Sequence, residues 1–343
     1  MVGNDERTPE TDRREVNEAP HAAVVYHPAK ASLRQIRELA TARETALEWA
    51  PTRWYPTRAE DSGLNATRDA ISGGPAVLLV AGGDGTVRAA AAVLQGTGIP
   101  MALLPAGTGN LLARELGVVL NDTETAVAAA FTGHDRRIDV GIVELENEHR
   151  QRTTHVFVVM AGIGLDADMA ENTNALAKKH LGWAAYVTPI ARSVIANRLF
   201  HVVYRVDGSR AHSSRAHTII VGNCGTLAGN MLLIPRAVID DGLLDVVMMR
   251  PTGRFGWAGI GSRLTLQGAA RRSRLSRRIL RRIPDLHSLA YAQGSAFDAA
   301  FDQPRAIQLD GDSVGKVRAV RITVQPGALL VRTQHPALLA GVS

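Results

Sequence analysis

The stretch LLVAGGDGTVRAAAAVL, residues 78–94, predicts the fold of the first half of the chain. A short apolar run stops at three glycines, an aspartate and a threonine, and an alanine-rich, helix-forming run follows. A glycine turn between a strand and a helix lets backbone N–H groups approach a phosphate chain and points the helix N-terminus at it. The stretch therefore predicts a phosphate-binding turn.

A second turn of the same kind follows in LLPAGTGNLLAR, residues 103–114. If both turns follow neighbouring strands of one parallel sheet, they open at its carboxyl edge, where α/β proteins bind ligands. Each turn alone is equally compatible with a tight connection, with Asn110 as a helix N-cap. Two of them in succession favour a ligand site. The Walker pattern is absent, and Arg88 occupies the position of the third small residue in the dinucleotide fingerprint.

The pattern around these turns predicts two domains. Strands alternate with helices over residues 22–135, which is typical of a doubly wound, Rossmann-like parallel sheet. Beyond Arg136 short β-rich segments predict an antiparallel β-sandwich, with one helical insert around residues 171–198. The predicted organisation is a disordered tail (1–20), an α/β nucleotide-binding domain (21–137), a β-rich substrate domain (138–328) and a C-terminal segment that returns to the first domain (329–343).

Composition narrows the class of partner. The net charge of +6 favours an anionic ligand or surface, and 4% aromatic residues disfavour a single-stranded nucleic-acid binder. One cysteine fits a reducing compartment, and no apolar run is long enough to span a bilayer. We expect a cytoplasmic protein with peripheral membrane contact. The arginine-rich residues 271–283 could lie as a helix on anionic lipid, although a solvated helix face explains them as well.

The motifs GGDGT and PAGTGNLLAR together resemble the diacylglycerol kinase catalytic-domain family, which includes bacterial lipid kinases and sphingosine kinases. The first motif is shared with NAD kinases, and the second favours the lipid-kinase branch. The resemblance covers residues 22–333 and implies an NAD kinase/diacylglycerol kinase-like fold. It also implies ATP and Mg²⁺ as cofactors and an active site between the two domains.

The resemblance implies a set of nucleotide-binding residues. They are Thr57, Gly82, Gly83, Asp84, Gly85, Thr86, Val87, Arg88, Gly107, Thr108 and Asn110. Arg114 is a further candidate for neutralising phosphate. The chain departs from the family pattern at His27, where many relatives have Asn, and at Leu111, where some relatives have an acid.

Candidate catalytic acids lie in IQLDGDSVG, residues 307–315. Asp310 and Asp312 would share one face of an extended segment, and their repulsion would raise one pKa toward that of a useful base. We expect Asp312 to accept the hydroxyl proton with Asp310 as its partner. Asp84 is the rival base, because the sphingosine-kinase branch gives that role to the acid of the glycine turn. A Gly-flanked acidic hairpin turn is the alternative without chemistry.

Residues 233–249, LIPRAVIDDGLLDVVMM, resemble the structural metal loop of the family. Carried over, Asp241 gives a side-chain ligand to Mg²⁺, and Val238 and Leu243 give main-chain carbonyls. An acidic turn before a strand explains the same residues. Asp139 matches another family acid and would join a metal–water network.

These features predict an ATP-dependent lipid kinase that converts diacylglycerol to phosphatidic acid. The alternatives are a kinase for a sphingoid base, a polyprenol or another hydroxyl, and a non-catalytic nucleotide- or membrane-binding protein on the same fold. The sequence leaves a homodimer open.

Overall fold

The computed structural model describes residues 19–29, 32–164, 199–225, 234, 237–250 and 289–334. The helical insert around 171–198 and the arginine-rich residues 271–283 lie outside this part of the chain, as does most of the predicted N-terminal tail. Within the described residues, no helix is both long and apolar enough to cross a membrane.

The first body alternates strands and helices as the sequence predicts. Its elements are β1 (His21–Tyr26), α1 (Leu33–Leu47), β2 (Ala50–Pro56), α2 (Leu64–Ser72), β3 (Val77–Gly82), α3 (Asp84–Leu94), β4 (Met101–Pro105), α4 (Leu111–Glu115) and α5 (Thr123–Thr132). The strands β2, β1, β3 and β4 lie in this order and pair in parallel. Buried apolar side chains cover both faces of this sheet, which explains why β3 is apolar at every position.

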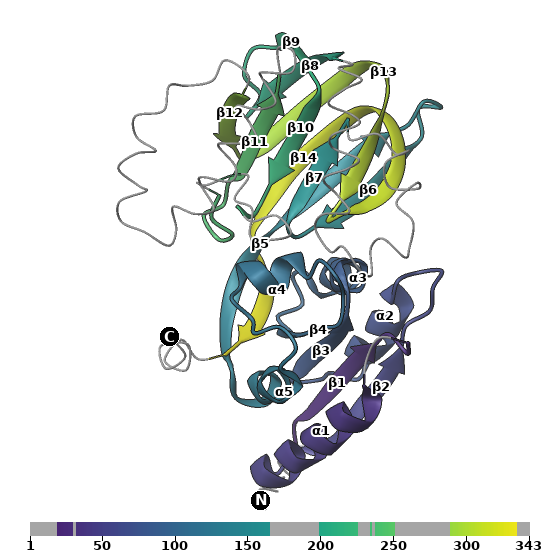
Figure 1. Ribbon diagram of the computed structural model, residues 1–343, viewed down its shortest axis with the longest axis vertical. Coiled ribbons are helices and arrows are strands. Elements are labelled where there is room, and N and C mark those ends of the chain that lie inside the picture. Colours follow the sequence, from purple (N-terminus) through teal and green to yellow (C-terminus); the bar gives the residue numbers. More distant parts are fainter. Residues whose placement is uncertain are drawn as a thin grey trace, which may run out of the picture.

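The second body is built from antiparallel strands. It contains β6 (Arg152–Phe157), β7 (Met160–Ile163), β8 (Phe200–Val206), β9 (His212–Ala216), β10 (Thr218–Gly222), β11 (Leu244–Met249), β12 (Leu289–Gly294) and β13 (Ala296–Leu309). A separate core fills it, with Phe157, Phe297 and Ile163 among its fully buried side chains. The predicted class, a parallel α/β domain followed by a mainly antiparallel β domain, is confirmed (Figure 1).

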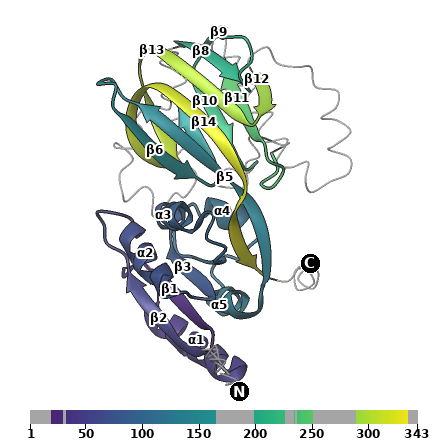
Figure 2. The same ribbon diagram turned by 180° about the vertical axis from the view of Figure 1, so that it is seen from behind.

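Two long strands join the bodies, β5 (His134–Glu146) and β14 (Asp312–Thr333). They pair antiparallel along most of their length, and Val331 and Arg332 pair in parallel with β4. The predicted boundary at 137/138 lies within β5, whose Val140 packs in the first core and whose Val143 packs in the second. In the described residues one sheet therefore runs through both bodies, as the view from behind also shows (Figure 2).

One predicted strand, THVFVVMAG, is divided in the structure. Its first half is β6, which pairs with β5, and its second half is β7, which pairs with β10 and β13. The backbone N–H groups of Val158 and Val159, between the two halves, donate to the carboxylate of Asp310. Such a side-chain acceptor leaves no trace in hydrophobic periodicity, which explains why the sequence predicts one strand.

Candidate active site

The first glycine turn connects β3 with α3 at the carboxyl edge of the parallel sheet. A methyl group in place of a hydrogen on Gly82 would lie 2.7 Å from the Thr86 Cβ, and Thr86 is only 6% exposed. The Thr86 side chain thus packs beneath the turn and supports it. The turn itself faces the second body, because α3 and α4 lie at the end of the first body nearest the sandwich (Figure 1).

Asp84 holds the two glycine turns together. Its carboxylate accepts hydrogen bonds from the backbone N–H groups of Asn110 at 2.9 Å and Leu111 at 2.6 Å. A methyl group on Gly107 would lie 2.7 Å from the Gly83 Cα, so the two turns touch backbone to backbone. Burial raises the pKa of Asp84, while the two N–H donors lower it and the charge of Asp312 raises it further. Asp84 therefore caps α4, not its own helix.

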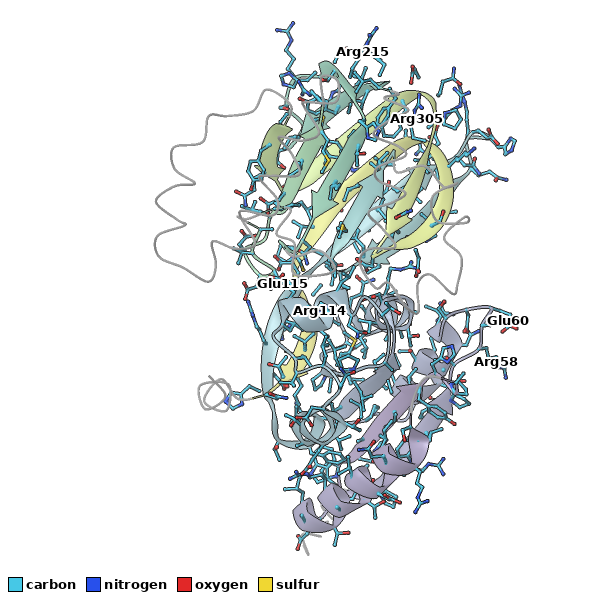
Figure 3. The ribbon with its side chains drawn as sticks, in the orientation of Figure 1. Arg58, Glu60, Arg114, Glu115, Arg215 and Arg305 are labelled. Atoms are coloured by element: carbon cyan, nitrogen blue, oxygen red, sulfur yellow. The ribbon has the colours of Figure 1, made fainter. Side chains whose placement is uncertain are left out.

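The second glycine turn is braced from within. Asn110 has a left-handed backbone (φ 48°), and its side-chain amide bonds the backbone N–H and carbonyl of Gly107. Asn110 is the N-cap residue of α4, as the sequence suggests, but its side chain makes no cap bond, and the Asp84 carboxylate accepts N–H groups there instead. The Arg114 Nε donates to the Gly109 carbonyl at 2.8 Å. Figure 3 shows Arg114 and Glu115 at the junction with the sandwich.

Both departures from the family pattern lie beside the glycine turns, where their backbone N–H groups make hydrogen bonds. His27 directly follows β1, and its backbone N–H donates to the Ala81 carbonyl at 3.0 Å, beside the first glycine turn. Leu111 is buried in the first core, and its backbone supplies one of the two donors to Asp84. Thr57 directly follows β2 and is nearly buried, with its N–H bound to the Tyr26 carbonyl. All three lie at the edge of the sheet where the glycine turns open.

The hairpin between β13 and β14 carries the other two candidate acids. Asp310 and Gly311 have positive φ angles of 50° and 91°, and Leu309 pairs with Asp312 across them. This is a two-residue turn of the kind that Asp-Gly favours. The expectation that Asp310 and Asp312 share a face of an extended segment is therefore wrong, because one acid lies in the turn and the other begins the next strand.

Asp310 is buried and saturated with backbone donors. Its carboxylate accepts from the N–H groups of Val158, Val159 and Met160 at 2.8–3.0 Å. Burial raises the pKa of this carboxyl to about 6, although the three N–H donors act in the opposite direction. Asp310 ties the hairpin to the break between β6 and β7.

Asp312 has a different environment. Its side chain is 49% exposed, and its Oδ2 lies 3.0 Å from an Nη2 of Arg88, which is on α3. A methyl group on Gly85 would lie 2.7 Å from the same oxygen. The hairpin of the second body thus carries Asp312 onto the first turn of α3, beside the predicted phosphate-binding turn.

His155 on β6 is a neighbour of this cluster that the sequence analysis does not single out. Burial and the charge of Arg88 lower its pKa, which favours the neutral imidazole. Its Nε2 lies 3.0 Å from the Thr153 hydroxyl. Nothing in the local sequence indicates this position, because it depends on β6 packing against α3.

Asp139 clamps the junction between the bodies. It is 1% exposed, and its two oxygens accept from the backbone N–H groups of Gly242 and Gly327, each at 2.7 Å. Its own carbonyl accepts from the Asn223 side chain at 2.8 Å. The observed contacts join β5, the loop before β11 and a bend in β14. The metal–water role of Asp139 stays a prediction.

The predicted metal loop contains two exposed acids, Asp240, which pairs with Arg136, and Asp241. The Asp241 side chain makes only weak or local contacts. Its Oδ1 accepts from the Leu243 N–H at 3.0 Å, and its Oδ2 lies 3.5 Å from the Gln293 side-chain nitrogen. In the part of the chain that the structure describes, no three His, Cys, Asp or Glu side chains cluster as metal ligands. The donor set still fits Mg²⁺, which is commonly bound through one or two carboxylates and keeps several waters.

Sequence comparisons agree with the two bodies. Residues 21–143 match the diacylglycerol kinase catalytic domain, and residues 158–260 match the YegS C-terminal NAD kinase beta sandwich-like domain. The chain is 31% identical over 319 residues to a "Probable lipid kinase YegS-like" of Pseudomonas aeruginosa (strain UCBPP-PA14), with 90% of this chain and 92% of that protein covered. The chain belongs to the diacylglycerol kinase catalytic-domain family.

A second relative is a "Diacylglycerol kinase" of Mycobacterium tuberculosis (strain CDC 1551 / Oshkosh), 30% identical over 187 residues. The match covers 54% of this chain and 58% of that protein. Among solved structures, a diacylglycerol kinase from Bacillus anthracis str. Sterne has a TM-score of 0.68 at 22% identity, covering 94% of this chain and 99% of that one. Yeast NADH kinase has a TM-score of 0.52 at 10% identity, covering 96% and 89%. These structural likenesses establish the fold.

Proposed function

We propose that the protein is an ATP-dependent kinase that transfers the γ-phosphoryl group to a hydroxyl of a membrane lipid, with diacylglycerol as the acceptor and phosphatidic acid as the product. The observation that carries the proposal is the position of Asp312. A half-exposed carboxylate from one body lies on the first turn of α3, next to two glycine turns of the other. Phosphoryl transfer to an alcohol needs such a carboxylate beside bound phosphate.

The glycine turns would hold the ATP phosphates. The backbone of residues 83–86 and 108–109 lies at the carboxyl edge of the sheet and would offer N–H donors, and α3 is an 11-residue helix whose positive end favours anions. Asp84 would act by fixing one turn against the other. Thr57 lies at the same edge and would contact the nucleotide.

Asp312 would act as the general base. It would accept the proton of the lipid hydroxyl while the hydroxyl oxygen forms a bond to the γ-phosphorus. The bond from that phosphorus to the bridging oxygen would break in line, and ADP would leave with the electron pair. Asp310 would take no proton in this scheme, because its oxygens already accept three backbone N–H groups. Asp310 would fix the hairpin turn from which Asp312 projects.

Mg²⁺ would accompany ATP and neutralise charge on the phosphates. A second, structural Mg²⁺ would bind Asp241 and the carbonyls of Val238 and Leu243. There it would brace the loop that Asp139 clamps through Gly242. The arginine-rich residues 271–283 would add an attraction to anionic membranes, where the acceptor resides.

The test is a transfer assay with purified protein, Mg²⁺, γ-labelled ATP and mixed micelles that contain diacylglycerol, sphingosine, a polyprenol or no acceptor. We expect label in phosphatidic acid alone. Label in another lipid would support the kinase activity but identify a different acceptor. If ATP binds and no lipid is labelled, the lipid-kinase proposal is wrong.

A further inference from the structure

The Arg88 side chain joins α3 to the β13–β14 hairpin. Its Nη2 lies 3.0 Å from the Oδ2 of Asp312, a residue 224 positions away in the chain. The Arg88 side chain is only 19% exposed. An ion pair with one enclosed partner is screened less by water than a pair on an open surface, so its geometry is better defined.

Gly85 leaves space on α3 for the carboxylate of Asp312. Because a methyl group at this position would lie 2.7 Å from the Asp312 Oδ2, that oxygen occupies the space a side chain would fill. Gly85 and Arg88 are three residues apart on one helix and so face the same side. The N-terminus of α3 adds a favourable dipole for the carboxylate. The first turn of α3 is therefore complementary to the Asp312 carboxylate in shape and in charge.

The charges around Arg88 favour a role toward this carboxylate over a role toward ATP. Its positive charge lowers the pKa of Asp310 and of His155, so both lie within its electrostatic reach. Two acids already compensate the guanidinium, and one of its nitrogens is committed to Asp312. The side-chain bond of Arg88 is thus directed to the second body. Replacing Arg88 would remove the side chain that bonds the Asp312 carboxylate.

We propose that Arg88 is a positioning residue for the base, which holds Asp312 on the first turn of α3 and so couples the second body to the phosphate-binding turn. The inference rests on the proposed function and goes beyond it. The resemblance to the family assigns Arg88 to phosphate binding, whereas the geometry assigns it to Asp312. On this account position 85 is a glycine because a side chain there would occupy the space of the Asp312 carboxylate and hinder the approach of phosphate.

The kinetic test compares Arg88→Gln, Arg88→Lys, Asp312→Asn and the double variant Arg88→Gln/Asp312→Asn. We expect Arg88→Gln to lower kcat about 10²-fold, the effect of a misplaced catalytic group, with KM for ATP nearly unchanged. Arg88→Lys recovers part of kcat because it restores the charge. The double variant is no slower than Asp312→Asn, since residues that act as a unit are not additive. Arg152→Gln removes an arginine from a surface ion pair on β5 and β6 and serves as the matched control.

A rise in KM for ATP at unchanged kcat would overturn the inference and make Arg88 a phosphate ligand. Additive losses in the double variant would overturn it too. A urea-unfolding cycle of the same variants without nucleotide separates this inference from the kinase proposal. Non-additive midpoints support the Arg88–Asp312 contact even if no lipid is labelled, and additive midpoints reject it even if lipid is phosphorylated.

Discussion

The glycine turns of the first body and the β13–β14 hairpin of the second both contain aspartates beside glycines, but they use them differently. Asp84 and Asp310 are engaged by two and three backbone N–H groups of other segments. Asp312 is bonded by a side chain and is half exposed. Backbone donors and burial identify the acids that hold segments together. Asp312, the acid that we propose as the base, is instead exposed at the junction between the bodies.

The largest effect on stability is expected at Asp310. Asp310→Ala leaves three backbone N–H groups, two of them buried, without their acceptor and should lower the free energy of unfolding by about 3–5 kcal/mol. Asp302→Ala, on β13 before this turn but exposed, is the matched control and should change it by less than about 0.5 kcal/mol. Urea unfolding at pH 7 measures both. Equal midpoints for the two variants would break the proposed division between structural and exposed acids.

The raised pKa of Asp310 predicts a pH dependence of the same comparison. The folded state holds this proton up to about pH 6, whereas the unfolded state releases it near pH 4. The contribution is therefore complete below pH 4 and is lost as the pH rises through 6, by about 3 kcal/mol in all. The difference between the urea midpoints of the wild type and Asp310→Ala should therefore be largest near pH 4 and become smaller, but not vanish, as the pH rises to 7. A constant difference across this range would contradict the raised pKa.

A smaller effect is expected where the two glycine turns touch. Gly107→Ala places a methyl group 2.7 Å from the Gly83 Cα, and backbone cannot swing aside. We expect a loss of about 1–3 kcal/mol and weaker ATP binding by calorimetry. Gly73→Ala is the control, because its methyl group would meet the flexible end of Arg53. If Gly107→Ala binds ATP normally, the contact between the turns is not needed for the site.

The smallest effect concerns the predicted metal loop. Millimolar Mg²⁺ should stabilise the wild type by about 1 kcal/mol if its concentration is a few times Kd, and EDTA should remove the gain. Asp241→Ala should abolish this gain, and Asp240→Asn, which changes the neighbouring acid, should retain it. Thermal unfolding with and without Mg²⁺ provides the measurement. An identical gain in both variants would place the ion elsewhere.

Local patterns predict the elements and both glycine turns because their signals are contained in short stretches. Residues 78–94 fold as β3, a turn and α3, as their composition indicates. The continuous sheet is harder to predict from the sequence. The strands β5 and β14 each contribute to two cores, and no change of composition within them marks the point where they cross from one core to the other. The division of residues 154–162 into two strands depends on an acid about 150 positions away.

The candidate site shows the same limit. Spacing places Asp310 and Asp312 close together, but their different roles depend on a left-handed backbone at Asp310 and on which segments supply donors. The pairing of Arg88 with Asp312 and the approach of His155 arise only when α3 packs against the second body. Sequence identifies the acids, and packing decides what each one can do.

The most direct test of the account is the rate of phosphoryl transfer to diacylglycerol by Asp312→Asn and Asp84→Asn, each measured beside its ATP affinity. Asp312→Asn should bind ATP like the wild type and lose about 10²- to 10⁴-fold in kcat. Asp84→Asn should weaken ATP binding because it loosens the two turns. If Asp84→Asn abolishes transfer with normal ATP binding while Asp312→Asn stays active, the base lies in the glycine turn and the account is contradicted.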